Sequence, residues 1–149
     1  ATVEQVLSAV ALCKSRAIQT GMFLMWGYAG EQLSDIEATI AHVKRTNPDV
    51  FLTTVSYPIK GTPYFHEVES AVVSTRAWAE GSDRDYVIRG RHSRRFYKFA
   101  DQLLRSEVEL ARSTNGPGHA LDVPPLAGIR SSIEEARAGL ESAFTEVEA

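Results

Sequence analysis

The residues best suited to hold a ligand follow an apolar run and read Gly27, Tyr28, Ala29, Gly30 and Glu31. Glycines let a backbone approach a ligand closely and adopt turn geometries that other residues resist. Main-chain N–H and C=O groups in such a turn could hold a planar, polar ligand such as a nucleoside, with Glu31 bonding a ribose hydroxyl or an amino group. The alternative interpretation is a tight turn with Glu31 in solvent. The spacing matches neither the dinucleotide-binding fingerprint nor a P-loop.

A second candidate is the loop that follows the next β-branched and aromatic run. Two prolines and a glycine fix its path, and a rigid loop is suited to lining a binding site. The alternative is that Pro58 only ends a strand, with Tyr57 and Tyr64 packed as core aromatics. The site-lining candidates are Tyr57, Pro58, Lys60, Gly61 and Thr62.

Basic residues interleaved with aromatic ones gather between positions 84 and 98. Such a mixture can bind nucleic acid through phosphate contacts and stacking. After Ser93, however, the aromatics recur at helical spacing, which better suits packing, so we expect no nucleic acid. The remaining alternatives are a solvated basic face, recognition of an anionic substrate, or contact with another domain. The central arginines are Arg89, Arg91, Arg94 and Arg95.

The whole chain of 149 residues has a net charge of −3 and a single cysteine, Cys13. One cysteine excludes an internal disulfide, and the four scattered histidines show no metal-ligand spacing, so we expect no metal site within this chain. No apolar run reaches the ~18 residues that a membrane span needs. Without a charged and apolar leader, the default location is the cytoplasm.

Two helix–strand pairs position the first two candidates. Residues 2–20 carry apolar residues at helical spacing, with a capping box of Thr2 and Gln5 and a stop at Gly21. The continuous apolar run at 22–26 predicts a strand that is buried on both faces, as in a parallel sheet covered by helices.

The second pair begins at a capping-box pattern of Ser34 and Glu37 and continues as a helix with an apolar stripe. This helix should end at Asn47, because residues that precede proline avoid helical geometry. Residues 50–57 are β-branched and aromatic and predict the second strand. Helix, strand, helix, strand with short links is typical of an α/β fold with parallel strands, as a sheet or a barrel.

The rest of the chain predicts a C-terminal α+β extension. A short helix from Pro63, a hairpin of 71–78 with 85–90, and a long amphipathic helix from Ser93 follow one another. A stretch rich in Gly and Pro then predicts a flexible linker. The resulting divisions are a helix–strand–helix–strand–loop unit at 1–65, an extension at 66–112, a linker at 113–128 and a terminal helix at 129–149.

Residues 21–65 resemble the later half of radical S-adenosylmethionine enzymes, most closely the cobalamin-binding group that includes the anaerobic magnesium-protoporphyrin ester cyclases. That group shows a G-[FY]-P-G-E-T turn after an apolar strand, a helix beginning D-I-x-x-T, and a strand ending Y-P-x-x-G-T-P-x-[YF]. Ala29 and Gln32 depart from its usual proline and threonine. The matching residues are Gly27, Tyr28, Gly30, Glu31, Asp35, Ile36, Thr39, Tyr57, Pro58, Gly61, Thr62, Pro63 and Phe65.

The resemblance implies that residues 1–65 form the later part of a TIM-like partial β/α barrel. The turn at Gly27 to Glu31 would lie near the adenosine of S-adenosylmethionine. Residues 66–112 would lie over the barrel mouth, where a small-molecule substrate binds.

The family uses a 4Fe–4S cluster to cleave S-adenosylmethionine and generate a 5′-deoxyadenosyl radical. Three cysteines in C-x-x-x-C-x-x-C hold that cluster, so we expect its ligands, and any cobalamin domain, in an N-terminal part of the same protein upstream of Ala1. The isolated chain should then be inactive. The alternative is a stand-alone module that binds a nucleoside, S-adenosylmethionine or another protein without catalysis.

Overall fold

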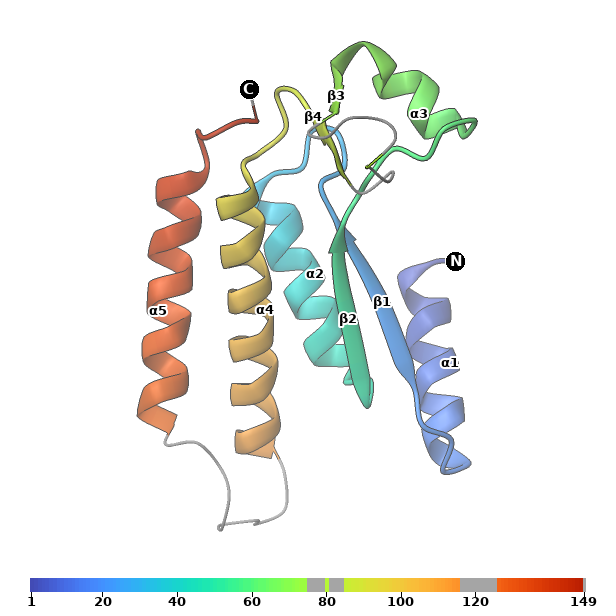
Figure 1. Ribbon diagram of the computed structural model, residues 1–149. Helices are drawn as coiled ribbons and strands as arrows, with labels where there is room; N and C mark the ends of the chain where they lie inside the picture. Colours follow the sequence, from blue (N-terminus) through green and yellow to red (C-terminus); the bar gives the residue numbers. More distant parts are fainter. Residues whose placement is uncertain (75–79, 81–84, 116–125, 149) are drawn as a thin grey trace.

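The computed structural model describes residues 1–74, 80, 85–115 and 126–148. Helices and two small sheets succeed one another along the chain (Figure 1). The elements are α1 (Val3–Ser15), β1 (Gly21–Trp26), α2 (Leu33–Thr46), β2 (Val50–Val55), α3 (Pro63–Val68), the 3-10 turn η1 (Glu69–Ala71), β3 (Val72–Ser74), β4 (Tyr86–Ile88), α4 (Arg94–Asn115) and α5 (Leu126–Ala143).

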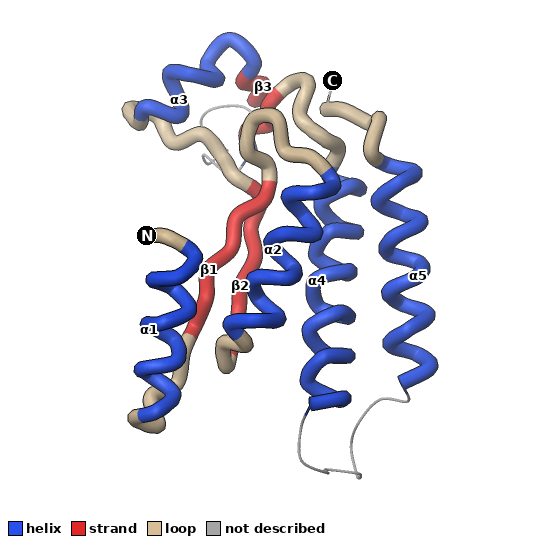
Figure 2. The backbone as a smooth tube through the Cα atoms, turned by 180° about the vertical axis from the view of Figure 1, so that it is seen from behind, coloured by secondary structure: helices blue, strands red, loops and turns tan. Residues whose placement is uncertain are grey.

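Strands β1 and β2 pair in parallel, with Gly21 opposite Val50 and Trp26 opposite Val55. Helix α2 connects them, so their carboxyl ends lie at the same edge of the sheet (Figures 1 and 2). The predicted α/β class with parallel strands is confirmed. Ligands bind at the carboxyl ends of strands in such folds.

Helix α1 begins as predicted but ends early. The backbone N–H of Thr2 donates to Gln5 Oε1 at 2.8 Å, and that of Gln5 donates to Thr2 Oγ1 at 3.3 Å. The predicted stop at Gly21 is wrong, because the helix ends at Ser15 and Ala17 adopts a left-handed conformation with φ 56°. Gly21 is instead the first residue of β1.

A contact between distant residues explains this early end. The carboxylate of Asp49 accepts hydrogen bonds from the Thr20 backbone N–H at 2.6 Å and the Thr20 hydroxyl at 2.8 Å. Thr20 is thereby fixed beside the start of β2, and the chain before it cannot remain helical.

The ends of α2 differ in how well the sequence predicts them. A start at Ser34 and Glu37 is wrong: the helix begins at Leu33, and Asp35 accepts the Gln32 backbone N–H at 2.8 Å. The predicted end is confirmed, since Asn47 takes a left-handed conformation with φ 45°.

Strand β1 is not buried on both faces, contrary to prediction. Met22, Leu24 and Trp26 point toward the core, whereas Phe23 is 64 % exposed and Met25 37 % exposed. The described helices that pack on the sheet cover only one of its faces, and an apolar run cannot show what covers the other.

The core lies between this covered face and three helices. Helices α4 and α5 run side by side in opposite directions, with α2 next to α4 (Figures 1 and 2). The apolar stripes predicted for α2 and α4 are buried here. The core residues are Trp26, Ile36, Ile40, Val43, Phe96, Tyr97, Ala100, Leu103, Leu104, Val108, Ile129, Ile133, Ala136, Leu140 and Ala143.

The predicted C-terminal elements are present with altered bounds. Strands β3 and β4 form the antiparallel hairpin, and the residues that connect them lie largely outside the described part. Residues 116–125 of the predicted linker also lie outside it, while 113–115 and 126–128 are helical. The terminal helix ends at Ala143, because the backbone beyond it bonds to residues 90–93.

Two glycines in α5 provide a matched test of this packing. A Cβ at Gly139 would lie 2.5 Å from the Phe99 ring, whereas one at Gly128 would meet nothing within 4 Å. We expect Gly139→Ala to destabilise the fold by about 1–3 kcal/mol through overpacking. Gly128→Ala should stabilise it by about 0.5–1 kcal/mol through helix propensity. Urea unfolding measures both, and equal effects would contradict the close packing of α4 on α5.

Candidate functional site

The turn after β1 is closed by its own carboxylate. Gly27 and Gly30 have φ values of 86° and 78°, which favour glycine. Glu31 Oε2 accepts the Gly27 backbone N–H at 2.9 Å, and Tyr28 O accepts that of Glu31 at 3.2 Å. Glu31 is half-buried rather than in solvent. Its Oε1 makes no hydrogen bond to any described residue, so one oxygen remains for a ligand.

Close packing explains one of these glycines. A Cβ at Gly27 would lie 3.0 Å from Val55 Cγ1 and 3.3 Å from both Ser56 Oγ and Arg91 Cδ. A Cβ at Gly30 would meet nothing within 4 Å. The backbone at Gly27 is therefore approached by the protein's own side chains, and only Gly30 leaves open space.

Ser56, which the sequence analysis passed over, joins the ends of the two strands. Its backbone N–H donates to Trp26 O at 2.7 Å, and its hydroxyl donates to Gly27 O at 2.7 Å. The same hydroxyl lies 3.2 Å from Tyr64 Oη, and Arg91 Nη1 donates to Ser56 O at 2.6 Å. The sequence offers no signal for it: the predicted strand of residues 50–57 includes Ser56, whereas β2 ends at Val55.

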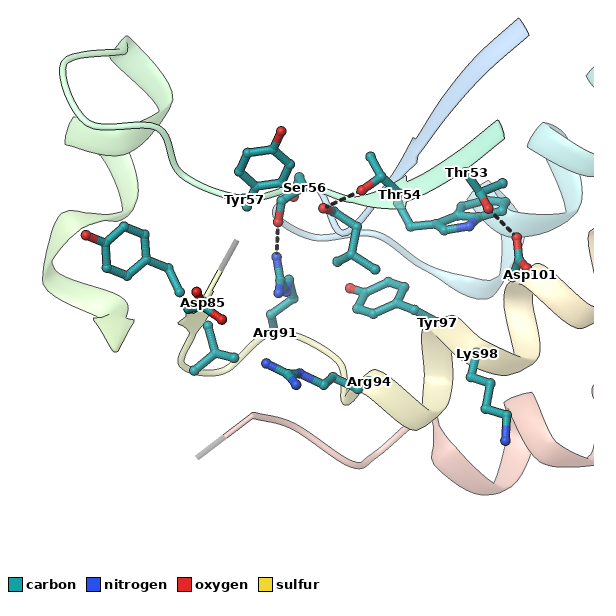
Figure 3. A pocket seen from close by; sticks show the side chains of 14 residues that line it. Thr53, Thr54, Ser56, Tyr57, Asp85, Arg91, Arg94, Tyr97, Lys98 and Asp101 are labelled. Carbon is teal, nitrogen blue, oxygen red and sulfur yellow. Dashed lines mark hydrogen bonds between the residues drawn. The ribbon is translucent and has the colours of Figure 1, made fainter. Parts of the chain in front are cut away.

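The predicted loop residues are dispersed. Pro58 is buried, and Lys60 and Gly61 are exposed, Gly61 with φ 83°. Thr62 caps α3 by accepting the Phe65 backbone N–H at 3.3 Å. Tyr57 lines a different cavity from the turn (Figure 3).

The four central arginines separate into different surroundings. Arg95 Nη1 lies 2.5 Å from Glu146 Oε1, and Arg94 Nε lies 4.0 Å from Glu148 Oε1. Both therefore face carboxylates of this chain's own C-terminal segment. Arg91 contacts the end of β2, and Arg89 is exposed beside the turn.

Two cavities border these residues, and Arg91 and Tyr97 line both. We call them the turn cavity and the edge cavity. The turn cavity, of about 340 Å³, is lined by the whole turn from Gly27 to Gln32 and by residues that include Tyr64, Arg89 and His92. The edge cavity, of about 480 Å³, lies along residues 53–57 and the first turns of α4 (Figure 3). Both volumes are within the range of small-molecule sites.

Burial raises the pKa of two lining groups. It raises the pKa of the Glu31 carboxyl above its ordinary value near 4.5, although the Gly27 N–H favours the charged form. Burial, and next the charge of Glu31, raises the pKa of Tyr97 well above its ordinary range. Tyr97 is consequently a neutral hydrogen-bond donor at any physiological pH.

The fold and the turn define a parallel α/β unit with a ligand-sized cavity at the carboxyl ends of its strands. No family model, curated protein or solved structure matches this chain. Within the described residues, no three His, Cys, Asp or Glu side chains are grouped as metal ligands. No helix among those residues has the length and apolar character to cross a bilayer.

A paired substitution tests the close packing at the turn. Gly27→Ala and Gly30→Ala both place a side chain at positive φ, which costs about 1–2 kcal/mol. Gly27→Ala should cost about 1–3 kcal/mol more, because its Cβ also meets Val55 and Ser56. The free energy of unfolding in urea distinguishes the two, and equal losses would show that the turn has room at Gly27.

The raised pKa of Glu31 predicts a pH dependence of stability. The folded state holds the proton more tightly than the unfolded state, so this contribution is complete below about pH 4.5 and falls as pH rises through the folded pKa. The stability of the natural protein relative to Glu31→Gln should fall in that window, as measured by urea unfolding across pH.

Glu107 is the opposite control. Burial alone would raise the pKa of Glu107. The bonds from Lys44 at 2.7 Å and Arg137 at 2.8 Å outweigh this effect, so the pKa is lowered overall. The stability of the natural protein relative to Glu107→Gln should therefore fall as pH drops below 4.5, the ordinary pKa of this carboxyl. The same slope for both variants would contradict the burial of Glu31.

Proposed function

We propose that this chain is the C-terminal part of a radical S-adenosylmethionine enzyme, with the turn cavity holding part of that cofactor. The observation that carries the proposal is the turn cavity itself. It lies at the carboxyl edge of the parallel sheet and is lined by the four residues that the resemblance assigns to the cofactor-binding turn: Gly27, Tyr28, Gly30 and Glu31.

Charges in the turn cavity suit a zwitterionic ligand. Glu31 offers its free Oε1 to an amino or hydroxyl group, and exposed Arg89, which also lines the cavity, offers a guanidinium to a carboxylate. S-adenosylmethionine carries an amino group, a carboxylate and ribose hydroxyls. The half-burial of Glu31 strengthens such bonds relative to bulk water.

The exposed face of the sheet supports a larger parent protein. Phe23, Val50 and Leu52 are 64 %, 62 % and 63 % exposed, and Met25 lies on the same face. Parallel sheets are normally covered on both faces. In a partial β/α barrel this face would point inward, toward upstream strands, and we propose that the N-terminal part of the same protein covers it.

Under this proposal the cluster ligands also lie upstream. The single cysteine, Cys13, lies near the carboxyl end of α1, at the opposite end of the sheet from the turn (Figure 1). The bound cluster would supply the electron that cleaves S-adenosylmethionine. This chain would bind and orient S-adenosylmethionine at the turn and shield it from water with Tyr64, His92 and Tyr97.

A direct test uses the natural full-length protein, purified and reconstituted with iron and sulfide without oxygen. With dithionite, we expect it to convert S-adenosylmethionine to 5′-deoxyadenosine and methionine. Glu31→Gln keeps an oxygen to accept the Gly27 N–H but removes the charge, so S-adenosylmethionine affinity should fall about tenfold. Equilibrium dialysis measures this affinity.

Glu67→Gln is the matched control, since Glu67 is exposed on α3 and lines neither cavity. Its affinity should equal that of the natural protein. A full-length protein without an upstream C-x-x-x-C-x-x-C, or Glu31→Gln with unchanged affinity, would contradict the proposal. Binding without cleavage would favour the stand-alone binding module.

A further inference from the structure

The edge cavity is distinct from the turn cavity and is not used by the cofactor proposal. It lies between residues 53–57, the start of β4 and the first turns of α4 (Figure 3), beside the edge of β2 that no other described strand pairs with. Only Arg91 and Tyr97 are shared with the turn cavity. A molecule in the edge cavity would thus lie next to one in the turn cavity, with these two side chains between them.

Two guanidinium groups border the same space. Arg91 Nη1 donates to the neutral carbonyl of Ser56 rather than to a carboxylate, and its charge is offset at longer range by Glu31 in the turn cavity. The Arg94 side chain extends toward Arg91 in Figure 3, and its nearest described carboxylate is that of Glu148 at 4.0 Å. An anion in the edge cavity would place a negative charge beside both arginines.

Buried donors without partners lie in the same wall. Tyr97 Oη, Trp26 Nε1 and Arg91 Nε have no hydrogen-bond partner among the described residues. Tyr97 is only 3 % exposed and Trp26 only 2 %. A buried donor left unpaired costs about 1–3 kcal/mol. Small side-chain adjustments, which are common on binding, would let an acceptor in the cavity become that partner.

The rest of the lining restricts the kind of anion. Tyr57, Tyr86, Val55 and Val87 give the cavity an apolar and aromatic surface, which suits a ring-shaped body. Asp101 lines it too, but its carboxylate is bound by Arg105 at 2.7 Å and by Thr53. Asp85 adds a second carboxylate. Lys98 also lines the cavity, so three basic side chains stand against two carboxylates, and this single excess positive charge suits a singly charged carboxylate.

We propose that the edge cavity binds a small aromatic carboxylate, with its charge against Arg91 and Arg94 and its ring against the tyrosines and valines. Tyr97 donates a hydrogen bond to the carboxylate. The binding itself stands on this geometry alone. This carboxylate would be the substrate that reacts beside the cofactor in the turn cavity. That second assignment rests on the proposed function.

The probe for the test is 1-naphthoate, with uncharged 1-naphthamide as its isostere. Titration of the natural full-length protein, without S-adenosylmethionine or reductant, should show saturable 1-naphthoate binding by calorimetry. The amide should bind at least about tenfold more weakly, because it lacks the charge. Non-specific binding to the exposed apolar face of the sheet would instead give similar affinities for the carboxylate and the amide.

Two variants locate the site. Arg94→Gln should weaken 1-naphthoate binding about five- to tenfold, and Tyr97→Phe about tenfold. Tyr97→Phe should also leave the ligand-free protein as stable or more so, because it removes an unpaired buried hydroxyl. Arg130→Gln, an exposed position on α5, makes the same charge change away from the cavity and should leave the affinity unchanged.

Absence of saturable binding, equal affinities for naphthoate and naphthamide, or unchanged affinity in both cavity variants would overturn the proposal. Since no cofactor is present, failure of this test leaves the cofactor proposal intact. Conversely, naphthoate binding without S-adenosylmethionine cleavage would establish the anion site and refute the radical chemistry.

Discussion

The structure depends on the junction where Ser56, at the end of β2, meets Gly27, at the end of β1. One hydroxyl and one backbone N–H tie the two strand ends together, and the Ser56 carbonyl receives Arg91 from beyond the hairpin. There is no room for a side chain at position 27. Both cavities are built around this junction, because Arg91 forms a wall of each. The hydrogen bonds of Ser56 that hold both cavities in place thus include no pair of opposite charges.

The second organising feature is the asymmetry of the sheet. Helices α2, α4 and α5 supply nearly all of the buried apolar surface, and the sheet contributes chiefly through Trp26. Phe23 and Leu52, paired across the two strands, remain open on the other side. Contiguous exposed apolar side chains usually mark a contact surface. The helical layer therefore buries most of the apolar surface of the fold, while the other face of the sheet leaves apolar side chains exposed.

Periodic patterns predicted the elements well, because their signals are local. The stripe with Ile36 and Ile40, the proline after Asn47 and the alternation of helix and strand all depend on neighbours in the chain. Features set by distant contacts were not predictable. The early end of α1 depends on Asp49, and Ser56 carries no pattern of its own. The apolar run at 22–26 likewise predicts a hydrophobic strand, but it cannot show which elements cover the two faces of that strand.

The arginines beside the site are restrained by the last residues of the described chain. Glu146 and Glu148 bond both the side chains and the backbone around Ser93 and Arg94. During synthesis on the ribosome, the turn at Gly27 emerges before these carboxylates, because Glu146 and Glu148 follow it along the chain. The wall shared by the two cavities can consequently take its final form only when translation of this region is complete. A nascent chain therefore exposes the strand ends before the residues that restrain Arg94 and Arg95 have been made.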